Sequence, residues 1–180
     1  MAIHQRAGQQ ALQTDLVNIP KLMSHYYRII PNVEDVQQKV TFGTSGHRGS
    51  AFNASFNQNH IWAIAQAVVD YRQGAGITGP MIVGFDTHAL SYAAFMSVVE
   101  VLTANQVKVL IQKEDGFTPT PVVSQAIVRA NAAKPSGLVD GLIITPSHNP
   151  PQDGGIKYNP PHGGPAEGDI TKVIEAKANQ

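Results

Sequence analysis

The stretch Gly141-Leu-Ile-Ile-Thr-Pro-Ser-His-Asn-Pro150 joins an apolar run to a polar segment held between two prolines. Residues 142–144 are large and aliphatic, which favours a strand that is covered on both faces of a sheet. Pro146 and Pro150 each fix a φ angle, so the segment between them is stiffer than its length suggests. Because α/β proteins bind ligands at the carboxyl ends of such strands, we predict that Ser147 is a reactive group.

The rest of the chain alternates between strand and helix patterns. Strands are expected over 39–42, 81–85, 107–111 and 142–144, and helices over about 18–30, 61–74, 91–102 and 122–133. Helices between successive strands predict right-handed βαβ connections. We therefore predict an α/β fold of three layers, α/β/α, in which a mostly parallel mixed sheet of about four strands has helices on both faces.

Polar loops follow these predicted strands, at residues 43–49, 86–91, 115–121 and 145–150. Because parallel strands have their carboxyl ends at one edge of a sheet, we expect the loops to gather there. Asp153-Gly154 is typical of a hairpin turn, so residues 156–158 are predicted to return antiparallel beside the central strand. That return would bring Lys157 near Ser147.

The composition is that of a compact domain. The chain has 180 residues, 42% hydrophobic and 14% charged, with a formal net charge of zero. A nucleic-acid partner is disfavoured because it normally requires a basic excess. No apolar run approaches the roughly 20 residues that span a bilayer, and no secretory signal is recognised at the start. We therefore expect a cytoplasmic protein with no membrane partner, and the absence of cysteine excludes disulfides and thiolate metal sites.

Basic side chains in the sequence suit a phosphate near Ser147. Arg48 lies between Gly46 and Gly49, which allow close backbone approach, and its guanidinium matches phosphate geometry. Lys157 adds a second cation. Taken singly, a loop serine more often bonds its own backbone, and a lone arginine or lysine is more often a solvated charge. Together they favour a serine that carries a phosphoryl group.

Other chemistries have less support. A serine hydrolase would need a Gly-x-Ser-x-Gly elbow, and a nucleotide fold would need a Walker loop or a Gly-x-Gly-x-x-Gly between a strand and the helix that follows it. The sequence contains no such elbow and no Walker loop, and its Gly-x-Gly-x-x-Gly, residues 74–79, ends a predicted helix and precedes a strand. His47, His88 and His148 each follow a predicted strand, which leaves a zinc site as an alternative. It ranks low because no pair of them has helical or hairpin ligand spacing.

Two motifs resemble those of the α-D-phosphohexomutase superfamily. Thr145-Pro-Ser-His-Asn-Pro150, followed by Gly155-Ile-Lys-Tyr-Asn159, is similar to its phosphoserine loop. Phe42-Gly-Thr-Ser-Gly-His-Arg-Gly49 is similar to its N-terminal signature, in the form that most resembles bacterial phosphoglucomutases. The resemblance covers essentially the whole chain. It divides the chain into an N-terminal arm and helix, residues 1–38, and a first family domain, residues 39–180, that carries the phosphoserine loop.

The resemblance implies an intramolecular phosphotransferase that interconverts glucose 1-phosphate and glucose 6-phosphate through a phosphoserine, with glucose 1,6-bisphosphate as intermediate and activator. Ser147 would carry the phosphoryl group and contact Mg²⁺ through it. Lys157 and Arg48 would transfer the proton and stabilise charge. The other implied site residues shape the serine loop or line the substrate and phosphate pocket: His148, Asn149, Thr44, Ser45 and His47.

The match extends only to the first of the four domains of that family. The acidic metal loop, the sugar-specificity loop and the second phosphate loop belong to the other domains, and no Asp-x-Asp occurs in this sequence. The missing C-terminal domains and a hexose phosphate are therefore the expected partners, and the 180 residues alone are expected to be inactive. Two alternatives stay open: another phosphohexomutase, such as a phosphomannomutase, or a non-catalytic α/β module that binds anions.

Overall fold

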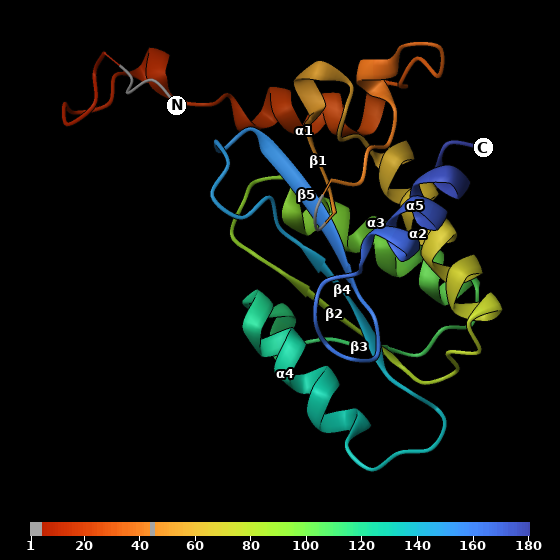
Figure 1. Ribbon diagram of the computed structural model, residues 1–180. Helices are drawn as coiled ribbons and strands as arrows, with labels where there is room; N and C mark the ends of the chain where they lie inside the picture. The colour runs from red at the N-terminus through yellow and green to blue at the C-terminus, as the bar shows by residue number, and fades with distance from the viewer. Residues whose placement is uncertain (1–4, 44–45) are drawn as a thin grey trace.

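Figure 1 shows the computed structural model of the protein, which describes residues 5–43 and 46–180. The α-helices are α1 (Ile19–Arg28), α2 (Gln58–Gly74), α3 (Ser91–Ala104), α4 (Thr120–Asn131) and α5 (Gly168–Ala178). The strands are β1 (His47–Ser50), β2 (Met81–Phe85), β3 (Val109–Leu110), β4 (Asp140–Ile144) and β5 (Asp153–Asn159). The predicted alternation of strands and helices is confirmed. Within the two described ranges, no helix is both long and apolar enough to cross a membrane.

The five strands form one mixed sheet in the order β1-β5-β4-β2-β3. β2 pairs in parallel with β3 and β4, because helices α3 and α4 supply the long crossovers that parallel pairing requires. The short segment after β4 allows only an antiparallel return, and β5 pairs in that way with both β4 and β1. The mixed sheet was correctly predicted, but it has five strands and only the β3-β2-β4 half is parallel.

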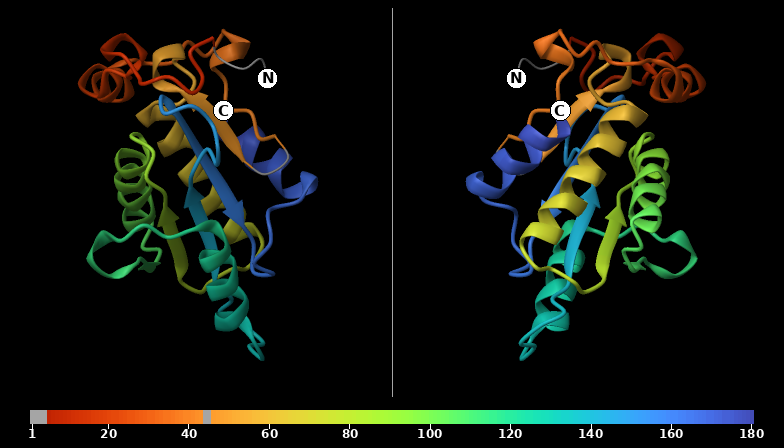
Figure 2. Two further views of the ribbon diagram at one scale, coloured as in Figure 1. Left: turned by 90° about the vertical axis from the view of Figure 1, so that its left-hand side faces the viewer. Right: turned by 90° about the vertical axis from the view of Figure 1, so that its right-hand side faces the viewer.

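Helices cover both faces of this sheet, as the two views of Figure 2 show for α4 and α2. On the face towards α4, two glycines let the helix pack close to the strands. A Cβ on Gly84 would come within 2.7 Å of Val123, and a Cβ on Gly141 would come within 3.0 Å of Ile127. Val123 and Ile127 are buried there in a small core with Ile143. The larger core lies on the opposite face, and the three-layer prediction is confirmed.

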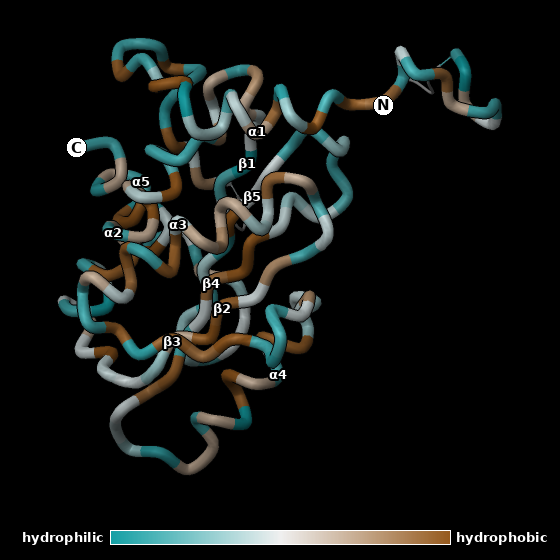
Figure 3. Tube along the Cα trace, turned by 180° about the vertical axis from the view of Figure 1, so that it is seen from behind, coloured by the Kyte–Doolittle hydropathy of each residue, from teal (hydrophilic) through white to brown (hydrophobic). Residues whose placement is uncertain are grey.

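The larger core is continuous with the N-terminal helix. Leu22 and Tyr26 of α1 are fully buried in it, and the Tyr26 hydroxyl donates to Ser97 Oγ of α3 at 3.0 Å. The Asn18 side chain caps α1 by accepting from the backbone N–H of Lys21 at 3.0 Å. In Figure 3 the central strands β2 and β4 are coloured mainly as hydrophobic, as expected for strands covered on both faces.

The prediction of a strand over residues 39–42 is wrong. Only Phe42 makes a β-bridge, to His47. Side chains of α5 and its C-terminal end bind the backbone of this segment instead: Asn179 accepts from Val40 N–H at 3.0 Å, and Glu175 accepts from Phe42 N–H at 2.6 Å. Because these side chains satisfy the backbone groups, the segment needs no neighbouring strand.

The antiparallel return after β4 is confirmed, but its turn lies earlier than predicted. Asp153 and Gly154 are already part of β5, and the chain reverses before them, where Asp153 N–H donates to Pro150 O at 3.0 Å. In the resulting register Lys157 lies opposite Ile143. The sheet therefore carries Lys157 back beside the residues that follow β4.

Candidate functional site

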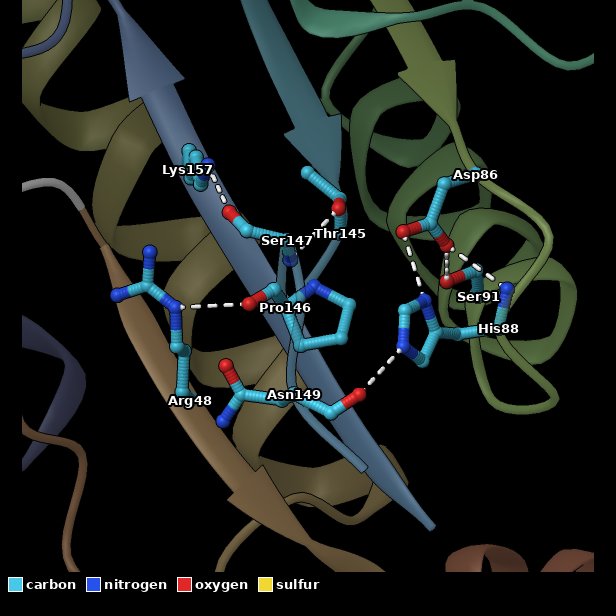
Figure 4. Close-up of polar contacts among 9 residues, drawn as sticks. All are labelled: Arg48, Asp86, His88, Ser91, Thr145, Pro146, Ser147, Asn149 and Lys157. Carbon is cyan, nitrogen blue, oxygen red and sulfur yellow. Dashed lines mark hydrogen bonds and ion pairs between the residues drawn. The ribbon is translucent and has the colours of Figure 1, made fainter. Parts of the chain in front are cut away.

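The candidate site lies at the carboxyl edge of β4 and β2, around the segment 145–152, which we call the serine loop (Figure 4). The loop after β2 reaches it through His88, whose Nε2 lies 3.1 Å from Asn149 O. The segment 115–119 approaches the same edge, since Thr118 N–H donates to Phe85 O at 3.0 Å. Three of the four predicted loops, residues 86–91, 115–121 and 145–150, therefore gather at this edge. The fourth, residues 43–49, is partly replaced by strand β1.

Ser147 is exposed and has an unusual backbone conformation. Its φ is +75°, a left-handed value that is uncommon for a residue other than glycine. Its N–H donates to Thr145 Oγ1 at 2.9 Å, which helps to hold that conformation. Lys157 Nζ donates to Ser147 Oγ at 2.8 Å. The predicted proximity of the lysine and the serine is therefore confirmed, and the loop presents the hydroxyl directly to the amine.

The surroundings of Lys157 lower the pKa of its amine. Partial burial lowers the pKa of its amine, and the positive charge of Arg48 lowers it further, while Asp86 acts in the opposite direction. The net effect is a pKa below the ordinary lysine value. A lysine with a lowered pKa is more easily deprotonated, so Lys157 can accept a proton from the serine hydroxyl that it contacts.

Arg48 belongs to the same edge but not to the element that we expected. It lies within strand β1, which is antiparallel to β5, instead of in a loop after a parallel strand. Its partner in the register is Gly155, and residues two apart on a strand share a face, so Arg48 and Lys157 are diagonal neighbours. Arg48 Nε donates to Pro146 O at 3.1 Å. The arginine therefore holds the backbone just before Ser147.

Asp86 and Thr145 also belong to this site, although the sequence did not single them out. The Asp86 carboxylate accepts from Ser91 Oγ at 2.6 Å and from His88 N–H at 2.9 Å, and the nearby Thr145 side chain also lowers its pKa. Burial alone would raise the pKa of Asp86, but these hydrogen bonds outweigh it and lower the pKa. An aspartate that directly follows a strand adjacent to β4 was the available signal, because the two strand ends must lie side by side.

The other predicted site residues have different places. His148 is exposed on the serine loop, and Asn149 Nδ2 donates to Asp153 Oδ2 at 3.1 Å. Thr44 and Ser45, expected to line the pocket, lie outside the described residues. The shaping of the loop by Asn149 has support from this contact, and the roles of the other residues stay predictions.

His47 is buried in the core instead of facing the serine loop. Its side chain is stacked between Phe56 and His60, with ring centroids 6.1 and 5.6 Å away. Nε2 lies 2.7 Å from Ser55 O and Nδ1 accepts from Thr41 N–H at 3.1 Å, which together suit a neutral ring. Burial lowers the pKa of His47 to about 4. This position does not support the predicted substrate-binding role of His47.

Acid is expected to destabilise the fold through His47. The folded pKa of about 4 lies below the unfolded value of about 6.5, so the unfolded chain binds a proton first as the pH falls. The free energy of unfolding should therefore fall by about 3 kcal/mol between pH 7 and pH 4. Urea denaturation of wild type, His47→Gln and the exposed-site control His162→Gln tests this. An equal pH dependence in His47→Gln and wild type would contradict the assignment.

Metal ligands are sparse around the serine loop. Over residues 5–43 and 46–180, no group of three His, Asp or Glu side chains is placed to hold a metal ion. Both ring nitrogens of His47 and of His88 contact protein atoms, which gives no support to the zinc alternative. The charged neighbours of Ser147, Arg48 and Lys157, are cations, so the described residues do not by themselves fit a Mg²⁺ site.

The fold and the site define an α/β domain that presents a strained serine beside two basic side chains. The family model for phosphoglucomutase/phosphomannomutase, alpha/beta/alpha domain I, matches residues 39–180. The chain belongs to this family. It is 58% identical over 173 residues to a phosphoglucomutase of Komagataeibacter xylinus, a match that covers 96% of this chain and 31% of the relative.

Solved structures of the family have the same architecture. A Paramecium phosphoglucomutase, pp63/parafusin in its open form, aligns with a TM-score of 0.70 at 28% identity, over 84% of this chain and 26% of its own. A putative phosphomannomutase from Thermus thermophilus aligns with a TM-score of 0.67 at 34% identity, over 77% of this chain and 30% of its own. The chain thus spans about a third or less of the length of these relatives.

Proposed function

We propose that the chain is the phosphoserine domain of a phosphoglucomutase, with residues 39–180 as the first family domain and residues 1–38 as an arm and helix packed on it. The observation that carries this proposal is the 2.8 Å contact between Lys157 Nζ and Ser147 Oγ, on a loop that Arg48 also holds. A serine that receives phosphoryl groups needs an exposed oxygen, a base and positive charge. These three residues would supply all three.

In the proposed step, Ser147 Oγ attacks a phosphorus atom of glucose 1,6-bisphosphate. The new bond is Oγ–P, the bond from phosphorus to the sugar oxygen breaks, and a glucose monophosphate leaves. Lys157 Nζ, in its neutral form, accepts the hydroxyl proton. Arg48 contributes positive charge beside the transferred group, and positioning and charge stabilisation are the main sources of rate in phosphoryl transfer. In the full cycle, phosphorylated Ser147 first donates its phosphoryl group to the free 6-hydroxyl of glucose 1-phosphate, and the sugar hydroxyl loses its proton. Ser147 then takes the 1-phosphoryl group of the glucose 1,6-bisphosphate that has formed, so that glucose 6-phosphate leaves and the phosphoserine is regenerated.

The remaining parts of the proposal lie outside these 180 residues. The partners would be a hexose phosphate and the further domains of a longer enzyme in the cytoplasm. Mg²⁺ would reach this chain only through the phosphate on Ser147, with its other ligands supplied from elsewhere. No step above depends on the ion. His148 would shape the serine loop, and Thr44 and Ser45 would line the substrate pocket.

The 180-residue chain is expected to accept a phosphoryl group without turning over sugar phosphate. It offers the nucleophile, but it lacks the anchoring of the rest of the substrate, and positioning can account for roughly 7–11 kcal/mol of a barrier. The chain is incubated with glucose 1,6-bisphosphate and Mg²⁺ and followed by intact mass, and the conversion of glucose 1-phosphate is assayed in parallel. A chain that never gains a phosphoryl group would instead support a non-catalytic anion-binding module. Faster labelling by mannose 1,6-bisphosphate would favour a phosphomannomutase.

A further inference from the structure

The serine loop lies against the loop that follows β2. On one side of Ser147, Thr145 Oγ1 accepts the Ser147 N–H at 2.9 Å, and the Thr145 side chain lies close enough to the Asp86 carboxyl to lower its pKa. On the other side, His88 Nε2 lies 3.1 Å from Asn149 O. His88 Nδ1 lies 2.9 Å from Asp86 Oδ2, so this contact links Asn149 to the Asp86 carboxylate (Figure 4).

Thr145 supports the serine from the end of β4. Its Oγ1 accepts from the Ser147 N–H at 2.9 Å, which helps to hold Ser147 at its φ of +75°. The Thr145 side chain also lowers the pKa of Asp86, so the carboxylate lies close to the side chain that holds the serine backbone.

The contacts of His88 extend the same support. Its two ring nitrogens lie within hydrogen-bond distance of two acceptors, Asp86 Oδ2 on one side and Asn149 O on the other. The carboxylate that contacts this histidine, Asp86, lies on its own loop. His88 is half-buried, with 17% of its side chain exposed. The ring thus links the carboxylate to the far end of the serine loop.

We propose that Asp86 and His88 are positioning residues that hold both ends of the serine loop and so keep Ser147 Oγ against Lys157. Neither side chain contacts the serine oxygen itself. Their effect on phosphoryl transfer rests on the proposed function, but their effect on the loop does not. The support comes from an adjacent parallel strand, so the central β2-β4 pair sets the geometry of the reactive serine.

Amide hydrogen exchange, measured by NMR on the 180-residue chain, tests the proposal without any phosphoryl chemistry. Thr145→Val and Asp86→Asn should each speed exchange of the Ser147 N–H by about tenfold or more. The first removes the acceptor of that N–H, and the second removes the charge that supports the loop through His88. Thr145→Ser keeps the hydroxyl and should restore slow exchange. Thr171→Val is the matched control, because Thr171 and Thr145 are each 6% exposed and Thr171 lies on α5.

A general loss of stability would speed exchange at buried amides of α2, such as Val68, by the same factor as at Ser147. That outcome, or unchanged Ser147 exchange in Thr145→Val, would overturn the proposal.

His88→Gln should speed exchange at Ser147 by a smaller factor. This variant replaces Asp86→Asn in the test if Asp86→Asn fails to fold. Each folded variant is then labelled with glucose 1,6-bisphosphate. The variants could show the expected changes in exchange while the wild-type chain takes up no phosphoryl group. That result would refute the proposed function and leave the positioning role intact.

Discussion

Ser147→Ala is expected to abolish phosphoryl uptake from glucose 1,6-bisphosphate, with a loss of more than about 10³-fold in the labelling rate. The alanine removes the oxygen that Lys157 contacts, and with it the nucleophile of the proposed step. Ser147 is exposed, so the substitution should leave the free energy of unfolding nearly unchanged. Intact mass and peptide mapping of the labelled chain measure the effect.

Ser24→Ala, at an exposed position of α1, is the matched control and should be labelled like wild type. Peptide mapping of wild-type protein should place the phosphate on residue 147. Undiminished labelling of Ser147→Ala, with the phosphate mapped to another serine or threonine, would show that the reactive residue has been misassigned. Urea denaturation of both variants confirms that neither result reflects unfolding.

The sequence pattern around residues 142–159 was enough to predict the central strand β4 and the antiparallel strand that follows it. Residues 142–144 form a continuous aliphatic run, and a strand buried on both faces is what such a run forms in an α/β sheet. The segment after it is too short for a crossover, so an antiparallel return was the only geometry available. The proximity of Lys157 to Ser147 follows from that return alone. This part of the site could be predicted because it depends on residues within one hairpin.

The errors lie where distant side chains replace local partners. Residues 39–42 have a strand-like pattern, but Asn179, which is 139 residues away from Val40, binds their backbone. His47 lies in a polar, glycine-rich motif, yet its ring is buried and stacks with Phe56 and His60, so its predicted substrate-binding role stays without support. Asp86 was overlooked for the same reason, because its link through His88 to Asn149 joins two different strand ends. Sequence spacing carries no information about such contacts until the strand order is known.

Lys157→Met is expected to slow phosphoryl uptake by Ser147 by about 10² to 10⁴-fold, the range typical of a lost general base. Methionine keeps much of the length and the apolar stem of lysine, so the packing of β5 should be preserved. In wild type, the rate should rise with pH as the amine loses its proton. Because burial and Arg48 lower the pKa of Lys157, the midpoint of that rise should fall below the usual lysine value of about 10.4.

The pH dependence of the phosphoryl uptake rate shows whether Lys157 acts as a base or only as a positive charge. Lys157→Arg keeps the positive charge but cannot deprotonate in this range, so it should lose both the rate and the pH dependence. Arg48→Gln removes a charge that lowers the pKa of Lys157, and the midpoint should therefore move to higher pH. Lys172→Met, at an exposed position of α5, is the matched control and should follow the wild-type profile. If Lys157→Arg retained the rate and the pH dependence of wild type, Lys157 would serve only as a charge, and the proton of Ser147 would have to leave through another group.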